Sequence, residues 1–148
     1  MEEAIKEAKL GIHSGHGGPF GAIIVKDNKI IGRGHNQVVA NNDPTCHGEI
    51  MAIHDACKNL GTFDLSGSTI YTTGEPCPMC LGAILWANID EIYYGCNIDD
   101  TEKIGFRDSI FYKISKPENR EKIIHELDRD ECLKLYEEYM AIENKKNY

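Results

Sequence analysis

The order of apolar and polar positions divides most of the chain into helical and strand segments. Apolar residues recur at three- and four-residue steps in three segments, which predicts helices over residues 2–13, 46–60 and 77–87. Four short runs rich in β-branched and aromatic residues predict strands over residues 20–25, 30–33, 69–73 and 91–95. The order α-β-β-α-β-α-β predicts an α/β fold, in which one three-layer α-β-α domain surrounds a mixed central sheet.

Polar stretches separate these segments. Residues 26–29 form a turn that joins the first two strands into a hairpin, and residues 36–44 are expected to be a loop. Beyond Gly95 the pattern weakens, although residues 130–142 return to a helical stripe. The sequence contains no internal repeat and no linker, so we expect residues 1–148 to form a single domain.

Composition and charge narrow the class of partner. The chain has 148 residues, of which 41% are hydrophobic and 27% charged, as in ordinary soluble globular proteins. Its 24 acidic and 16 basic residues give a net charge of −8, which makes nucleic-acid binding unfavourable and suits a small uncharged substrate better. No apolar run approaches the ~20 residues of a membrane span, and a cytoplasmic location is the default expectation.

Six cysteines would permit fifteen disulfide pairings in a secreted chain, but nothing here indicates secretion. Cys57 and Cys132 lie on apolar stripes of predicted helices, where we expect buried thiols. The apolar positions of the first helix are Ile5, Ala8, Leu10 and Ile12.

Two short motifs carry the candidate chemistry: His47-Gly48-Glu49 and Pro76-Cys77-Pro78-Met79-Cys80. Zinc takes nitrogen and sulfur ligands tetrahedrally, and three protein ligands leave the fourth corner open for water. Cys77 and Cys80 project from one side of a helix start, because residues three apart are neighbours on a helix surface. His47 opens the other motif helix, so two positive helix ends would face the metal and favour thiolates.

The spacing leaves two other interpretations open. A structural zinc site is usually closed by four Cys or His ligands, but Cys46 is adjacent to His47 and would point elsewhere. A redox Cys-x-x-Cys pair would need no upstream His-x-Glu motif. Glu49 and His47 are two residues apart and converge only if His47 lies at the frayed start of its helix.

Read together, Pro19-Phe20-Gly21-Ala22, Asn36 and the two motifs resemble the cytidine-deaminase-like superfamily, whose nucleobase deaminases carry the H-x-E…P-C-x-x-C pattern. The stretches 105–109 and 144–148 are similar to those of small bacterial guanine deaminases, which convert guanine to xanthine and ammonia. One departure is Gly48, where the family leads us to expect alanine.

The resemblance implies a set of roles. One Zn²⁺ per subunit would be held by His47, Cys77 and Cys80, and Glu49 would carry protons from water to the ring and the leaving amine. Asp108 would be a second carboxylate near the exocyclic amine. The substrate-binding residues would be Asn36, Phe20, Trp86 and Tyr148. The family implies a homodimer with exchanged C-terminal segments, in which Tyr148 closes the partner's pocket.

Each carried-over residue also has a plainer interpretation. Asn36 could stabilise a turn, Asp108 could cap a short helix, Phe20 could pack in the core, and Tyr148 could be a frayed tail. For Trp86 we expect packing rather than substrate contact. The remaining histidines, expected at the surface or at helix caps, are His13, His16, His35, His54 and His125.

Three functional hypotheses follow. The first is zinc-dependent hydrolytic deamination of guanine in purine catabolism or salvage. The second is deamination of another base or nucleoside, namely tRNA adenosine, cytosine or guanosine; a tRNA enzyme would need a basic surface. The third is a zinc-stabilised binding module without turnover.

Overall fold

The computed structural model describes residues 1–120 and 123–143. The chain divides into two compact units, Met1–Tyr112 and Lys113–Tyr148. The first unit contains every strand and every candidate site residue that the structure describes. That residues 1–148 form one deaminase domain stays a prediction.

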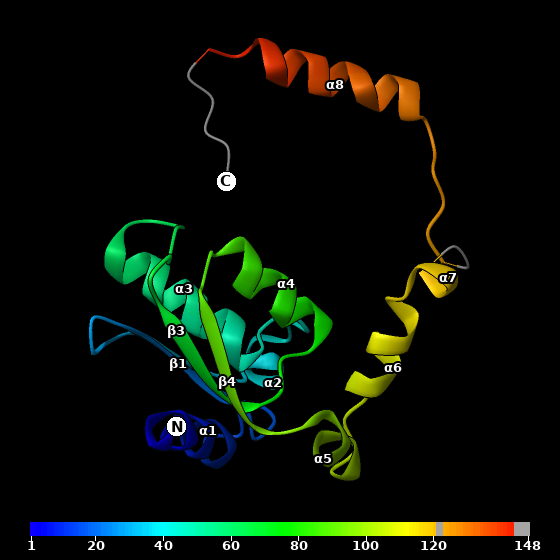
Figure 1. Ribbon diagram of the computed structural model, residues 1–148. Helices are drawn as coiled ribbons and strands as arrows, with labels where there is room; N and C mark the ends of the chain where they lie inside the picture. The colour runs from blue at the N-terminus through cyan, green and yellow to red at the C-terminus, as the bar shows by residue number, and fades with distance from the viewer. Residues whose placement is uncertain (121–122, 144–148) are drawn as a thin grey trace. The chain divides into compact units, whose positions relative to one another are not determined.

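A mixed four-stranded sheet forms the centre of the first unit (Figure 1). Its strands are β1 (Gly21–Lys26), β2 (Lys29–His35), β3 (Thr69–Gly74) and β4 (Glu91–Cys96), in the spatial order β2-β1-β3-β4. β1 pairs antiparallel with β2 and with β3, whereas β3 and β4 are parallel. Asp27 and Asn28 both have positive φ, which suits the two-residue turn of the predicted hairpin. The predicted α/β class with a mixed sheet is confirmed.

The helix α1 (Glu2–His13) packs against β1 through small residues. A Cβ atom at Gly21 would lie 2.2 Å from the carbonyl oxygen of Ala4, so the helix and strand backbones are in close contact. Ala8 is buried, as its apolar position suggested, together with Ala4 and Gly11. The other three apolar positions, Ile5, Leu10 and Ile12, are exposed because only small side chains fit this contact.

On the opposite face, α3 (Gly48–Leu60) lies directly on β2. A Cβ at Gly34 would be 2.3 Å from the backbone nitrogen of Ala52, and one at Gly32 would be 2.4 Å from the Ala52 carbonyl oxygen. The helix α4 (Pro78–Trp86) completes this layer, since Ile84 joins the core formed by residues of β1, β3 and α3. This packing holds the start of α3 at a defined position beside the sheet.

Three local predictions need correction. Residues Val38–Asn41, expected to lie in a loop, form the short helix α2. The motif helices begin at Gly48 and Pro78 rather than at residues 46 and 77, because His47 and Cys77 are extended N-cap residues. His35 is buried, not at the surface, since its ring bonds His16 (Nδ1···Nε2, 2.9 Å) and approaches the carboxylate of Glu7.

Beyond β4 the chain is helical in the described residues. The helices are α5 (Ile98–Lys103), α6 (Asp108–Ile114), α7 (Pro117–Arg120) and α8 (Arg129–Ala141). A capping box between Asn97 and Asp100 starts α5. The helix predicted over residues 130–142 is confirmed as α8, but Cys132 on it is exposed, so the expected buried thiol there is wrong. Cys57 is half-buried and packs against the core.

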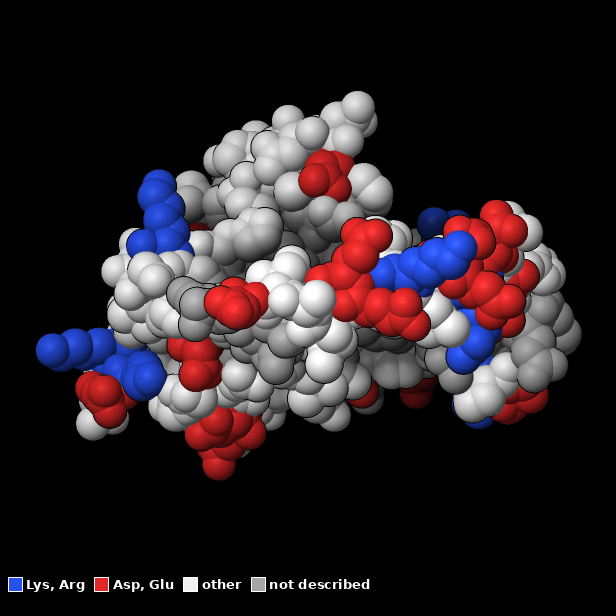
Figure 2. All heavy atoms as spheres, turned by 90° about the horizontal axis from the view of Figure 1, so that it is seen from above, with Lys and Arg blue, Asp and Glu red and all other residues white. Residues whose placement is uncertain are grey.

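The described surface carries interspersed charges. On the face drawn in Figure 2, Lys and Arg side chains stand among Asp and Glu and gather into no continuous basic patch. Within residues 1–120 and 123–143, no helix is long and apolar enough to cross a membrane.

The contact between β2 and α3 generates a test of the fold. Gly34→Ala should lower the free energy of unfolding by about 3 kcal/mol or more, because the added methyl group meets helix backbone that has no room to move. Gly82→Ala is the matched control, because nothing lies within 4 Å of its Cβ position in α4. This substitution should raise the free energy of unfolding by about 0.5–1 kcal/mol. Urea denaturation measures both, and equal stabilities of the two variants would contradict the close packing.

Candidate functional site

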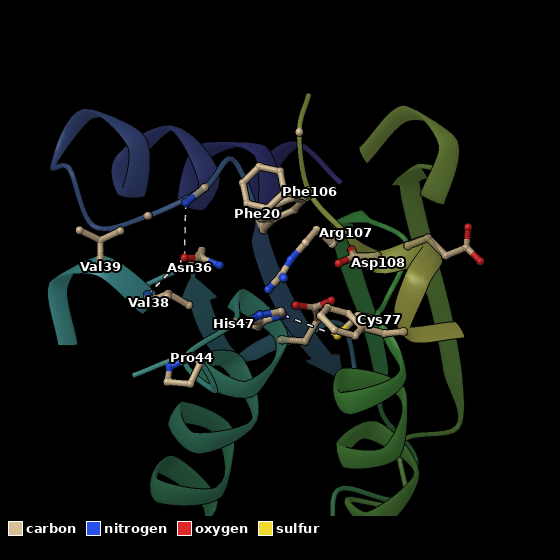
Figure 3. A pocket seen from close by; sticks show the side chains of 16 residues that line it. Phe20, Asn36, Val38, Val39, Pro44, His47, Cys77, Phe106, Arg107 and Asp108 are labelled. Atoms are coloured by element: carbon tan, nitrogen blue, oxygen red, sulfur yellow. Dashed lines mark hydrogen bonds between the residues drawn. The ribbon is translucent and has the colours of Figure 1, made fainter. Parts of the chain in front are cut away.

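Two helix N-termini converge on one point of the first unit. His47 is the N-cap of α3, and Cys77 is the N-cap of α4, with Cys80 in the first turn of α4. Both N-cap residues have extended backbone, with φ −71° and ψ 158° at His47 and φ −66° and ψ 167° at Cys77. Their side chains therefore leave the helices and meet between them, as Figure 3 shows for His47 and Cys77.

The three donor atoms have the spacing of zinc ligands. His47 Nδ1 lies 3.6 Å from Cys77 Sγ and 3.5 Å from Cys80 Sγ, and all three ligand atoms lie within 4.8 Å of one another. Sulfur at about 2.3 Å and nitrogen at about 2.0–2.1 Å from a tetrahedral zinc would be roughly 3.6 Å apart. The donor set therefore fits Zn²⁺ with little rearrangement.

The electrostatics of the thiols also fit a cation. A hydrogen bond from Cys80 lowers the pKa of Cys77 to about 4. The same bond, and then burial, raise the pKa of Cys80 well above its usual range. The hydrogen bond with Cys77 likewise raises the pKa of His47. Two buried thiolates at this distance repel each other, so both can be deprotonated together only with a positive ion between them.

The cluster holds three donors, not four. Among the described residues, His47, Cys77 and Cys80 are the one group of three or more potential ligands close enough to share a metal. Cys46, buried beside His47 in sequence, accepts a hydrogen bond from the Asn41 amide (3.5 Å) and does not join the cluster. Three donors fit an open site, and the thiols of Cys77 and Cys80 are not joined in a disulfide.

A cavity of about 450 Å³ opens beside the cluster, within the usual size range of small-molecule pockets. Glu49 lines it from the first turn of α3 and is only 6% exposed. Burial raises the pKa of Glu49 to about 7. Because His47 lies outside the helix as its cap, the two side chains reach the same cavity although they are two residues apart.

Asn36 lies directly after β2 and is 4% exposed. Its Oδ1 accepts hydrogen bonds from the backbone nitrogens of Val38 (3.2 Å) and Gly18 (3.4 Å). A Cβ at Gly17 would lie 2.0 Å from the same oxygen, so only glycine fits there. Asn36 thus stabilises the local turns and also lines the cavity, where Figure 3 shows its amide nitrogen directed inward.

Phe20 and Asp108 both line the cavity. Phe20 is half-buried and contacts Phe106 edge to face, with ring centroids 4.8 Å apart. Asp108 is the first residue of α6, inside the helix rather than at its cap position, and it reaches the cavity. Burial, and then the charge of Cys77, raise the pKa of Asp108 above its usual range.

Two predicted substrate-binding residues, Trp86 and Tyr148, are not among the described residues that line the cavity. Trp86 ends α4, is 67% exposed and does not line the cavity, so it is not part of the core, and its substrate contact stays a prediction. Tyr148 lies outside the described residues.

Sequence patterns did not single out several residues that line the cavity: Glu75, Phe106, Arg107 and Phe111. Phe106 and Arg107 belong to the stretch 105–109, whose resemblance had been assigned to Asp108 alone, so that stretch was a usable signal. Glu75 lies two residues before Cys77, and its carboxylate accepts a hydrogen bond from the backbone nitrogen of Ile98 (3.2 Å). Neither Glu75 nor Phe111 has a sequence signal of its own.

Comparisons with known proteins agree with this site. Residues 1–96 match the model of a family described as the cytidine and deoxycytidylate deaminase zinc-binding region. The chain is 44% identical over 150 residues to guanine deaminase of Bacillus subtilis (strain 168). The aligned region covers 100% of this chain and 96% of that protein. The X-ray structure of guanine deaminase from Bacillus subtilis matches with a TM-score of 0.92 over 99% of this chain and 95% of that chain.

Two further similarities bear on substrate. The tRNA-specific adenosine deaminase of Buchnera aphidicola subsp. Schizaphis graminum (strain Sg) is 38% identical over 135 residues, covering 91% of this chain and 87% of that protein. A structure solved in complex with 2,6-diaminopurine is 31% identical with a TM-score of 0.67, covering 72% of this chain and 60% of that chain.

The geometry of the three donors predicts the outcome of metal analysis. Cys80→Ala should lower the zinc content from about one ion per chain to nearly none, because two ligands hold a structural or catalytic zinc poorly. Cys46→Ala is the matched control, since it removes a buried thiol next to His47 that is not part of the cluster. Elemental analysis of both purified variants measures the difference. Loss of zinc from Cys46→Ala alone would contradict the assignment.

Proposed function

Because the chain belongs to the cytidine and deoxycytidylate deaminase zinc-binding family and is a zinc-dependent hydrolytic deaminase, we propose that it converts guanine to xanthine and ammonia. The observation that carries the choice of guanine is the similarity to Bacillus subtilis guanine deaminase. It extends through 99% of the chain at a TM-score of 0.92, well past the family region that ends at residue 96.

Glu49 is the proposed proton carrier. Zinc, when held by His47, Cys77 and Cys80, makes a water molecule nucleophilic at neutral pH. The Glu49 carboxylate accepts one proton of the attacking water and passes it to a ring nitrogen of the purine. It then takes the second proton from the hydroxyl group added to the ring carbon and passes it to the amine, which leaves as ammonia as the C–N bond breaks and the new C=O bond forms. Its burial against the cluster supports this role, because a shielded carboxylate neither loses its proton to bulk water nor needs to move far.

Asn36 and Phe20 are the proposed substrate-binding residues. With Oδ1 of Asn36 engaged by two backbone nitrogens, its amide NH₂ remains to donate to an acceptor on the purine. Phe20, held edge to face by Phe106, offers an aromatic surface for the base. Asp108 is the proposed second carboxylate near the exocyclic amine, a role that its place on the cavity wall supports.

The proposed assembly is a homodimer with exchanged C-terminal segments, in which Tyr148 closes the partner's pocket. The exposed apolar side chains of α8 support an assembling role for the C-terminal unit: Leu135, Tyr136, Tyr139 and Met140. Trp86 at the surface would contact substrate only if such an assembly brought it to a site. A cytoplasmic location is part of the proposal and is supported by six cysteines that form no disulfide.

The second candidate is a tRNA adenosine deaminase, favoured by the 38% identity to the Buchnera aphidicola enzyme. The net charge of −8 and the interspersed charges of Figure 2 weigh against it, because RNA binding requires a basic surface. Guanosine differs from guanine only by a ribose that needs a more open pocket.

Ammonia release from a substrate panel tests the proposal. The wild-type protein should deaminate guanine faster than guanosine, cytosine, adenine, adenosine or an adenosine-containing tRNA anticodon stem. Glu49→Gln should keep its zinc and lose guanine turnover by about 10²–10⁴-fold, the usual contribution of a general acid–base group. Brisk turnover of another panel member with negligible guanine activity would replace the proposed substrate, and a fully active Glu49→Gln would reject the proton carrier.

Subunit mixing tests the exchanged tail. A variant lacking Tyr148 should keep its zinc and lose much of its guanine turnover, as should Glu49→Gln for a different reason. If Tyr148 acts on the partner's site, co-refolding equal amounts of the two variants should restore roughly a quarter of wild-type activity, from random pairing with one functional site per mixed dimer. Each variant refolded alone is the control, and a mixture no more active than the controls would contradict the exchange.

A further inference from the structure

Arg107 is the one Lys or Arg among the described residues that line the cavity. It lies between α5 and α6, directly before Asp108. Figure 3 shows its guanidinium pointing into the cavity, between Asn36 and Asp108 and facing His47. The cavity otherwise contains carboxylates of Glu49, Glu75 and Asp108, so this cation is placed where a ligand with acceptor atoms would meet it.

The guanidinium group is oriented by a neighbouring ring but forms no ion pair with a described carboxylate. Its Cζ lies 5.6 Å from the centroid of the Phe111 ring, a cation–π distance that leaves the edge of the group available. Among the described arginine side chains, Arg33 and Arg129 form ion pairs with carboxylates and Arg107 does not. The N–H groups of Arg107 are therefore available for a bound molecule.

Guanine offers a matching pair of acceptors. A guanidinium donates two parallel hydrogen bonds from a rigid fork, and the O6 and N7 atoms of guanine are the acceptor pair that arginine contacts most often in nucleic acids. The amino group that leaves is on C2, which must face the metal ligands and Glu49. The O6/N7 edge then lies on the far side of the ring, the side from which Arg107 faces His47 in Figure 3.

We propose that Arg107 is a specificity-determining residue that reads the O6/N7 edge of a 6-oxopurine. This inference rests on the proposed guanine deamination and adds to it the group that selects the 6-oxo ring. A 6-aminopurine has an amino group where guanine has O6. An N–H donor of Arg107 would then face another N–H donor, and both would lack an acceptor inside the cavity. Asn36 adds a further donor but, as a single amide, lacks the two-point match.

Four purines that all carry the 2-amino leaving group separate this role from general binding: guanine, 7-deazaguanine without N7, 2-aminopurine without O6, and 2,6-diaminopurine with a donor at C6. The variants are Arg107→Ala and Arg107→Lys, with Lys103→Ala as control. Lys103 lies on nearby α5, pairs with Asp100 and does not line the cavity. The measurement is kcat/KM for each pair, with Tm and zinc content to establish folding.

Arg107→Ala should lower kcat/KM for guanine by roughly 5- to 150-fold, the discrimination of one bidentate arginine–guanine pair. The kcat/KM values for the three analogues, which lack part of the acceptor pair, should fall much less. The ratio of kcat/KM for guanine to that for each analogue should therefore decrease. Arg107→Lys should resemble alanine more than wild type, because lysine keeps the charge but loses the fork. Lys103→Ala should match wild type.

An equal loss on all four purines would mean that Arg107 supports the cavity without reading the edge, and would overturn the inference. So would Arg107→Lys with wild-type values. If the wild-type protein deaminates guanine and Arg107→Ala leaves its preference unchanged, only the role of Arg107 fails. If the wild-type protein deaminates none of the four, the proposed function fails, and the role of Arg107 fails with it.

Discussion

The meeting of two helix N-termini around three ligand atoms is the constraint on which the rest of this structure depends. His47 and Cys77 are caps, so their side chains are free of the helices and directed between them, and their separations already match a tetrahedral zinc. The buried thiols cannot both lose their protons without a cation. The fold must therefore hold the starts of α3 and α4 close together, and the glycines of β2 contribute to this by bringing α3 onto the sheet.

The cavity is lined partly by packed helix starts and partly by a connecting segment. Its floor comes from the starts of the two motif helices, which the sheet holds, while Asn36 is fixed by backbone hydrogen bonds that leave no room for a side chain at position 17. The opposite wall comes from the segment between α5 and α6, which supplies Phe106 and Arg107, and from the first residue of α6, Asp108. The candidate metal ligands and Glu49 are thus built on packed elements, whereas Phe106 and Arg107 are on a connecting segment, where substitution disturbs the fold least.

The ionisable groups of the cavity suit an uncharged ring as the bound molecule. Burial raises the pKa of Glu49 and of Asp108, so both carboxyls are less readily ionised than surface ones. The cation of Arg107 lies in the same cavity, next to Asp108 in sequence and on the wall that faces the start of α3. A neutral base with acceptors on one edge and a leaving amine on the other fits this polarity, whereas a phosphate backbone has no basic patch to meet on the face in Figure 2.

By itself the sequence determined the main helices and strands up to residue 96, the mixed α/β class and the candidate zinc ligands, because these depend on local periodicity and on residue types whose chemistry has few alternatives. The helix over residues 2–13 and the ligand set could be predicted for that reason. Only the tertiary structure decided which apolar residues are buried: on α1 the close approach to Gly21 selects alanines and leaves Ile5 and Leu10 exposed. It also decided that His35 is internal, that Trp86 is at the surface, and that Arg107 points into the cavity toward His47. Such placements depend on contacts between segments far apart in sequence, and no local pattern carries that information.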